Sequence, residues 1–448
     1  MRNNFKRLVP YLPLIFVAVC LYIFPYFLFP ERGDAFYHLV RAREILDNPF
    51  MGLFWDYLTY YPLGRAIWHP PLFHSIFAGL WYIGGVRFAY SIFCITQILS
   101  IVGIASWFAN KYYGPIAGLF AGILALAAPR ADILPVIMPA AYIPILAILT
   151  IHFLPKNKIK AFIMSLIGIW THIVGLIVFL PLFLIQDYKN RDNIKMALLL
   201  LPSIIFWAVY WIYFKNQAGT TTHIGLSLQL PWYTNFYGLF ILLIMGAVGL
   251  SILYKTNREQ FNLFAFYIAT IIFVQYLFGD ISRGFQYAAL PLAILSGLAI
   301  QKGYKSLIKC PFNLKHIFIL LLLLISSIGT FPFFSYLVNS DTHWDALNFP
   351  FEGQDYSLKE YIEKNTNLND VIWTEGDLSD LSAWMTGRRV SDGSNWGNGP
   401  PIDFVEQHQK INIYVSNDTF LIKNYYNNSI TQIKISPVPP QLTRHYYF

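Results

Sequence analysis

The stretch RGDAFYHLVRARE, residues 32–44, places two acids, a histidine and three arginines just after an apolar run. That run covers residues 8–30 and contains no charged side chain. It is long enough to cross a membrane, it exceeds the apolar part of a secretory signal, and no small-residue cleavage site follows it. We therefore interpret it as a retained transmembrane helix, with the charged stretch emerging beside the membrane.

Four polar side chains of this stretch have the spacing of neighbours on one helix face. The pattern i, i+3, i+4, i+7 is followed by Asp34, Tyr37, His38 and Arg41. A carboxylate on such a face can hold a divalent cation, orient an acceptor or act as a base. The alternative is an interfacial helix that Asp34 caps and whose arginines, Arg41 and Arg43, meet lipid phosphates. The spacing alone leaves both interpretations open.

The whole composition is that of a membrane protein. Of the 448 residues, 56% are hydrophobic and 12% are charged, against about 25% charged in an average globular protein. Apolar runs that suit membrane helices cover residues 8–30, 89–109, 115–129, 138–154, 160–171, 172–186, 195–214, 235–254, 260–278, 284–301 and 315–337. We expect an all-α polytopic membrane protein with about 11 transmembrane helices in residues 1–337.

The lysines and arginines predict the orientation of these helices. Residues 1–337 carry a net charge of +14, and 16 of their 24 Lys and Arg fall in loops on the same side as the N-terminus. By the positive-inside rule that side is cytoplasmic, which places the loop 31–88 and the segment 338–448 outside a cell membrane. The basic charge therefore indicates topology rather than nucleic-acid binding. The three cysteines have neither disulfide-framework nor metal-site spacing.

Residues 338–448 have the pattern of a small α/β domain. YSLKEYIEKNT (356–366) reads as an amphipathic helix and DVIWTE (370–375) as a strand. KINIYVSND (410–418) and ITQIKI (430–435) have strand character as well. We expect this segment to fold outside the membrane.

Other candidate site residues lie in the first external loop and at the mouth of a late helix. His69 and His74 have the residue type for a metal pair, but the surrounding aromatic and Pro-rich sequence equally fits an interfacial belt. Arg283, at the outer end of an apolar run, suits a lipid-borne phosphate. An ion pair with Asp280 is its alternative. We interpret His172 as an interhelical polar group.

Five segments together resemble a known family. GDAFYHLVRAREIL, YPLGRAIWHPPLFH, AAPRADILP, RGFQYAALPLAILSG and DVIWTEGDLSDLSAWMTGRRVSDGSNWGNG occur in the order and spacing of the catalytic subunit of oligosaccharyltransferases, with the archaeal branch the most similar. The resemblance implies a GT-C fold, with a helical membrane bundle and an external C-terminal domain. It also implies transfer of a glycan from a polyprenyl or dolichyl phosphate carrier to an acceptor.

The resemblance assigns roles to individual residues. It makes Asp34 the first acidic motif, which holds a divalent metal and the acceptor, and Arg283 the ligand of the donor phosphate. We add Arg41 as a second phosphate ligand, and we expect His38 or Tyr37 to position one of the reactants. WTEGDL replaces the family's WWDYG, so the residues assigned to the acceptor side are Trp373, Glu375 and Asp377.

Departures from the family pattern concern its carboxylates. The second acidic motif is reduced to Asp132, which comes too early, and the later external acid is absent around Gln229. A tightly bound Mg²⁺ or Mn²⁺ normally needs more than one carboxylate, so Asp34 alone makes a weak metal site. We therefore prefer a metal-independent glycosyltransferase over an oligosaccharyltransferase that depends on a metal and acts on an Asn-containing sequon.

The acceptor of this enzyme would be a protein, a lipid or a glycan. The alternative is an inactive relative that binds lipid-linked glycans or acts as a scaffold. A transporter fits less well, because no repeated halves are evident.

Overall fold

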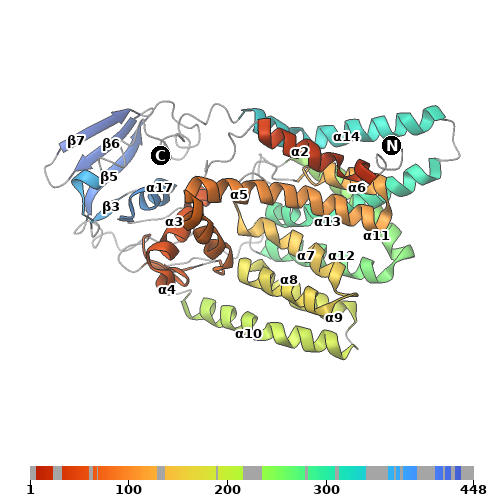
Figure 1. Ribbon diagram of the computed structural model, residues 1–448, viewed down its shortest axis with the longest axis horizontal. Coiled ribbons are helices and arrows are strands. Elements are labelled where there is room, and N and C mark those ends of the chain that lie inside the picture. Colours follow the sequence, from red (N-terminus) through yellow and green to blue (C-terminus); the bar gives the residue numbers. More distant parts are fainter. Residues whose placement is uncertain are drawn as a thin grey trace.

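The computed structural model shows a mostly helical chain with a small sheet at one end (Figure 1). The described residues are 7–23, 33–59, 64–67, 69–128, 137–187, 190–214, 235–277, 281–307, 312–339, 362–367, 370–373, 377–390, 409–416, 419–424 and 429–434.

Within these residues, each of the eleven apolar runs contains one helix of the bundle. The helices are α2 (Leu12–Ile23), α5 (Leu72–Tyr113), α6 (Pro115–Leu124), α7 (Tyr142–Phe153), α8 (Lys158–Thr171), α9 (Val174–Gln186), α10 (Arg191–Phe214), α11 (Phe236–Thr256), α12 (Arg258–Leu277), α13 (Ile281–Ser306) and α14 (Phe312–Asn339). Six of those described, α5 and α10 to α14, are long and apolar enough to cross a membrane. The protein is thus a helical membrane protein, and the count of eleven spans stays a prediction.

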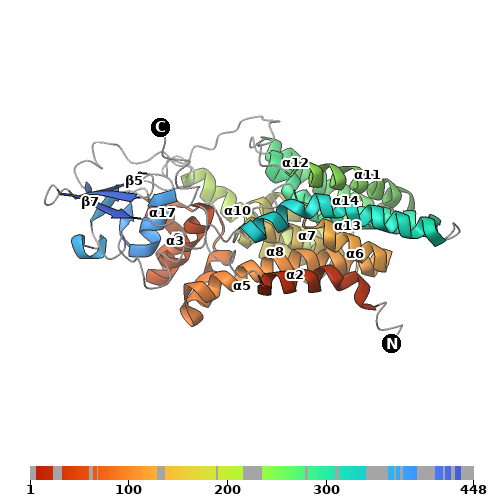
Figure 2. The ribbon, with the colours of Figure 1, turned by 90° about the horizontal axis from the view of Figure 1, so that it is seen from above.

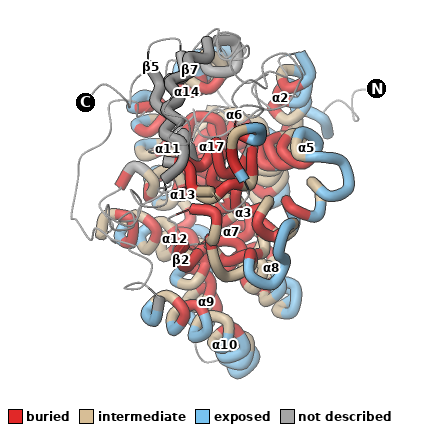
Figure 3. Tube along the Cα trace, turned by 90° about the vertical axis from the view of Figure 1, so that its left-hand side faces the viewer, coloured by how far each residue is buried: buried red, intermediate tan, exposed pale blue. Residues whose placement is uncertain are grey.

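Helix α13 lies at the centre of the bundle. It packs against α5, α6, α11 and α12, and its apolar part is largely buried, whereas α10 carries many exposed residues at the rim (Figure 3). Glycines allow the close approach of its neighbours: a Cβ on Gly249 of α11 would lie 2.0 Å from the Leu295 carbonyl oxygen. Small residues at such crossings are typical of membrane helices.

One helix boundary differs from the predicted runs. Helix α5 begins at Leu72 rather than near residue 89, and it continues through a kink at Gly85, where φ is +83°. Glycine adopts this conformation without the steric cost that other residues meet. The helix therefore carries residues of the predicted external loop into the bundle. Helices α8 and α9 are separate, with the break at His172 and Ile173.

A compact segment precedes α5 and consists of α3 (Gly33–Asp47), α4 (Pro49–Gly52) and the paired strands β1 (Trp55–Asp56) and β2 (Arg65–Ala66). A buried ion pair joins Arg41 to Glu44 within α3. Glu44 also accepts backbone N–H bonds of 2.7 Å from Tyr57 and 2.8 Å from Leu58. A second buried pair, Arg65 Nε to Asp56 Oδ2 at 3.0 Å, joins the two strands.

These contacts rule out the interfacial-helix interpretation of α3. Residues 35–42 are all buried, and Arg41 is only 1% exposed. Its guanidinium donates to Glu44 and to the carbonyls of Gly52 and Trp55. An arginine enclosed in this way does not lie among the headgroups of a membrane surface.

The sheet has the order β4-β3-β5-β6-β7. β3 (Val371–Trp373) runs parallel to β4 (Arg389–Val390) and β5 (Gln409–Ser416), and β6 (Thr419–Asn424) and β7 (Ser429–Lys434) follow as antiparallel neighbours. The strands predicted in DVIWTE, KINIYVSND and ITQIKI are confirmed. Residues 356–361 of the helix expected at 356–366 lie outside the described part.

Helix α17 (Asp377–Thr386), between β3 and β4, packs against α3 (Figure 2). The rings of Phe36 and Trp384 stack at 6.1 Å, and Arg43 donates to the Trp384 carbonyl. Gly387 has φ +68°, and a Cβ there would meet the Arg43 guanidinium at 2.7 Å. The segment around α3 and the C-terminal segment thus share one interface.

Candidate active site

Four histidines from distant parts of the chain form one cluster. The Nδ1 atom of His38 lies 2.9 Å from Nε2 of His74, so one of the two rings donates a hydrogen bond to the other. The rings of His69 and His172 stack with their centroids 4.7 Å apart. His38 joins the two pairs, because its ring lies 5.7 Å from that of His69. We call His38, His69, His74 and His172 the histidine cluster.

Each histidine is held where helices end or begin. His38 lies one turn after Asp34 in α3, and His74 lies in the first turn of α5. His69 comes just before the two prolines that precede α5. His172 lies at the break between α8 and α9, where its Nδ1 accepts a hydrogen bond of 3.2 Å from the Val174 N–H. The cluster therefore depends on packing among segments that are far apart in sequence.

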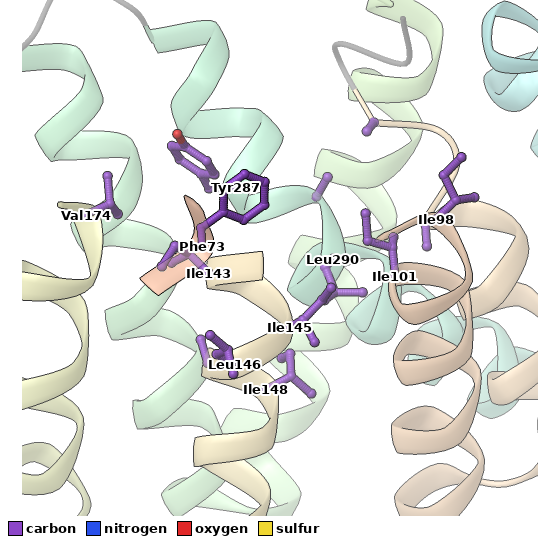
Figure 4. Close-up of a cluster of buried hydrophobic side chains, with 14 of the residues drawn as sticks. Phe73, Ile98, Ile101, Ile143, Ile145, Leu146, Ile148, Val174, Tyr287 and Leu290 are labelled. Carbon is purple, nitrogen blue, oxygen red and sulfur yellow. The ribbon is translucent and has the colours of Figure 1, made fainter. Parts of the chain in front are cut away.

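Buried apolar side chains pack beside the cluster. Phe73, Ile143, Val174 and Tyr287 belong to the buried hydrophobic group in Figure 4. The Phe73 ring lies 5.6 Å from that of His38, and Tyr287 lies 6.3 Å from His172. Such surroundings disfavour charged imidazoles.

Two of the histidines lie outside the apolar helices, and both have lowered pKa values. Burial lowers the pKa of His38 well below its usual value, with smaller contributions from His69 and Arg41. Burial, followed by the charges of Arg283, Arg65 and Arg41 in that order, lowers the pKa of His69 to about 3. Both rings are thus neutral at physiological pH. Arg283 of α13 thus acts electrostatically on His69.

Protonation of His69 should make the fold sensitive to acid. The unfolded chain takes up a proton near pH 6.5, whereas the folded chain does so near pH 3, so the free energy of unfolding falls as the pH falls through this window. Above the window this contribution is constant. Melting temperatures of purified protein between pH 7.5 and pH 4 should therefore decline less steeply for His69→Asn. His316→Asn, on the exposed surface of α14, is the control, and equal slopes for wild type and His69→Asn would contradict the assignment.

Two buried polar atoms at the cluster have no hydrogen-bond partner among the described residues. They are Tyr37 Oη and His69 Nδ1. Burial raises the pKa of Tyr37 to about 12, against the opposing charges of Arg65 and Arg41, so the phenol keeps its proton. A buried polar atom without a partner costs about 1–3 kcal/mol, and such atoms are concentrated at functional sites. Both atoms are thus suited to bind a substrate.

The predicted phosphate ligands differ in their surroundings. Arg283 is partly buried in the first turns of α13 and acts electrostatically on His69. Arg41 donates to Glu44 and to two carbonyl groups, which favours a positioning role for it. Its role as a phosphate ligand stays a prediction.

The predicted acceptor residues lie on β3, on α17 and between them. The backbone of Trp373 ends β3, and that of Asp377 begins α17. Glu375 lies outside the described residues, as do Asp132, Gln229 and Asp280. No contact of these side chains is described, so their roles stay predictions.

Sequence reasoning missed Asp380. It is fully buried in α17, and its charge raises the pKa of Tyr37 across the interface with α3. It follows Asp377 by three residues, so a helical reading of DLSDLSAW would have identified it as a second acid on the same side of the helix.

The described residues do not fit a Mg²⁺ or Mn²⁺ site. Among them, no three His, Cys, Asp or Glu side chains are placed to hold one ion. The groups gathered at the cluster are imidazoles, whereas Mg²⁺ prefers oxygen ligands. The assignment of Asp34 as a metal ligand stays a prediction, and no step below involves a metal.

Solved structures with a similar architecture include GT-C glycosyltransferases. The oligosaccharyltransferase AglB from Archaeoglobus fulgidus, in complex with an inhibitory peptide and a dolichol-phosphate, aligns with a TM-score of 0.60 over 98% of this chain and 75% of its own, at 12% identity. The chain has the GT-C fold. ArnT from Cupriavidus metallidurans, bound to undecaprenyl phosphate, aligns with a TM-score of 0.55 over 84% of this chain and 85% of its own, at 13% identity.

The GT-C likeness rests on structure rather than on sequence. No protein-family model matches the chain, and no curated protein matches it. At these identities the comparison shows the fold, and the predicted resemblance to GT-C glycosyltransferases is confirmed at that level.

Proposed function

We propose that the protein is a membrane glycosyltransferase that transfers a sugar or glycan from a polyprenyl- or dolichyl-phosphate carrier to an acceptor at the outer membrane face. The observation that carries this proposal is the packing of Tyr37 and His38 in the histidine cluster, on which the charge of Arg283 acts. These residues come from two helices far apart in sequence. The resemblance assigned Arg283 to the donor phosphate, and we expected His38 or Tyr37 to position a reactant at the same site.

The chemistry requires few groups. An acceptor hydroxyl attacks the anomeric carbon of the donor, and its proton passes to the Asp34 carboxylate. The bond between that carbon and the phosphate oxygen breaks, and the electron pair leaves with the carrier phosphate. The Arg283 guanidinium stabilises the charge that develops on the leaving phosphate.

The neutral groups of the cluster orient the acceptor in this scheme. Tyr37 Oη and His69 Nδ1 offer hydrogen bonds to its hydroxyl groups, while the His38–His74 bond holds the His38 ring in place. The apolar side chains beside the cluster exclude water and so limit hydrolysis of the donor.

The ligands bound in the similar structures support the donor class. AglB was solved with a dolichol-phosphate and an inhibitory peptide, and ArnT with undecaprenyl phosphate. Both ligands are lipid-borne phosphates, which a polar cluster beside apolar helices is suited to receive. The sugar and the acceptor of this chain are left to experiment.

The proposal includes a topology. Eleven spans would place the N-terminus in the cytoplasm and both the segment around α3 and the C-terminal α/β domain outside. The packing of α17 on α3 supports one shared compartment for these two segments. A cysteine introduced at Asn417 should react with an impermeant label on intact cells, and labelling only after lysis would refute the topology.

Arg283→Ala should lower the affinity for the lipid-phosphate donor by about tenfold or more, since it removes charge-assisted hydrogen bonds to phosphate. Arg283→Lys should also be impaired, because an ammonium lacks the fixed fork of a guanidinium. Donor binding to protein in detergent micelles measures both variants. Arg87→Ala, in α5, is the matched control for loss of one arginine. Unchanged donor affinity in Arg283→Ala would remove this residue from the donor site.

Chelation should change the rate of transfer less than about twofold, because the proposed mechanism depends on protein groups alone. The test compares rates before and after treatment with EDTA, followed by addition of Mg²⁺ or Mn²⁺. Loss of activity that either ion restores would show a metal site and would make Asp34 the first ligand to test.

Comparing cells with and without the gene tests the function as a whole. Mass analysis of surface proteins and lipids should show a glycan that is lost on deletion, restored by the wild-type gene and not restored by Asp34→Ala. Restoration by Asp34→Ala would instead favour the scaffold alternative. The departures from the family's acidic motifs in this sequence also support that alternative.

A further inference from the structure

Two lysines converge on a buried histidine at the opposite end of the bundle from the histidine cluster. Helix α5 runs between the two ends, from His74 to Lys111 (Figure 1). The Lys111 ammonium lies 3.5 Å from His152 Nε2, and the Tyr112 hydroxyl lies 2.8 Å from His152 Nδ1. Lys156, in the turn between α7 and α8, donates to the Tyr112 hydroxyl oxygen at 3.2 Å.

The direction of each hydrogen bond follows from the donor chemistry. An ammonium can only donate, so His152 Nε2 accepts from Lys111 and the imidazole hydrogen resides on Nδ1. Nδ1 therefore donates to the Tyr112 oxygen, which also accepts from Lys156. Both lone pairs of that oxygen are then used, and the phenolic hydrogen is left to donate elsewhere.

The cluster thus presents donors and positive charge. Among the described residues, no carboxylate forms an ion pair with Lys111 or Lys156, whereas the nearby Lys158 pairs with Asp192 at 3.6 Å. Aromatic rings hold the two ammoniums in place, with Lys111 5.0 Å from the Trp107 ring centroid and Lys156 5.1 Å from that of Tyr112. His152 beneath them is only 4% exposed.

We infer that Lys111, Tyr112, His152 and Lys156 form a binding site for a phosphate group, as carried by an anionic phospholipid headgroup. A phosphate offers several acceptor oxygens to the two ammoniums and the phenol, and its charge balances theirs. The site lies where apolar helices end, which is the level of lipid headgroups in a membrane. This inference is independent of the proposed transferase activity.

Titration of the full-length protein with phosphatidylglycerol, followed by native mass spectrometry, tests the site. The double variant Lys111→Gln/Lys156→Gln should bind this lipid about thirtyfold more weakly. This figure assumes that the loss of each lysine weakens binding by roughly tenfold or less. Tyr112→Phe keeps the ring beneath Lys156 and removes only the hydroxyl, and should weaken binding by about tenfold. It also serves as the second test if the double variant does not fold.

Lys160→Gln is the matched control, since this lysine follows in the first turn of α8 and its ammonium lies over Phe153. The site predicts a change of less than about threefold there. Equal losses in the control and the double variant, or no loss in the double variant and Tyr112→Phe, would overturn the inference. Added inorganic phosphate separates the sources: displacement of the lipid supports a site that also takes free phosphate, and no displacement supports a headgroup site.

Discussion

Asp34→Asn is expected to lower the rate of glycosyl transfer by about two to four orders of magnitude, the range typical of a lost general base. Asn has nearly the same shape and caps a helix about as well as Asp, so the amount of folded protein should not change. Asn cannot take up the proton of the acceptor hydroxyl. Initial rates at equal concentrations of folded protein in lipid vesicles measure the effect.

Asp47→Asn is the matched control for this variant. Asp47 ends the same helix, is half exposed and pairs with Arg43 at 3.5 Å. Its exchange should change the rate less than about twofold. Full activity of Asp34→Asn would show that Asp34 takes no part in the mechanism. Its role would then be that of a helix cap.

Breaking the buried Arg41–Glu44 pair is expected to have the largest effect on stability. Removal of one partner leaves the other as an uncompensated buried charge, which costs about 3–5 kcal/mol. Arg41→Gln and Glu44→Gln should therefore both lower the yield of monodisperse protein and its melting temperature. Glu44→Gln keeps an acceptor for the Tyr57 and Leu58 N–H groups, so its effect reports mainly on the charge.

The two variants also separate a positioning role from phosphate binding by Arg41. If Arg41 holds the fold, the folded fraction of each variant should bind the donor with similar affinity. If Arg41 binds phosphate, Arg41→Gln should remain stable and lose donor affinity, while Glu44→Gln binds normally. The second outcome would restore the assignment made from the family resemblance.

The bundle was largely predictable because each helix has its own apolar run. Membrane helices need long apolar stretches whatever their neighbours are, so local composition locates them. The boundary of α5 was missed because the predicted run began at residue 89, whereas the helix begins at Leu72 and continues through a kink at Gly85.

The site was predictable only in part. The spacing in α3 pointed to His38 and Tyr37, but the partners His69, His74 and His172 come together through packing among α3, α5 and the break before α9. One sequence carries no local signal for such long-range contacts. For the Arg41–Glu44 ion pair a local signal exists, because Glu44 follows Arg41 by three residues on the same helix, but our sequence analysis did not use it.

Release of the lipid carrier tests the central claim most directly. Purified protein in vesicles is incubated with membrane extracts that contain polyprenyl-linked sugars and acceptors, and the freed carrier is identified by mass. The account predicts that wild-type protein releases a polyprenyl or dolichyl phosphate or diphosphate together with a glycosylated product, and that Asp34→Asn releases neither at a comparable rate. Donor binding without carrier release by the wild-type protein, or equal release by wild type and Asp34→Asn, would contradict it.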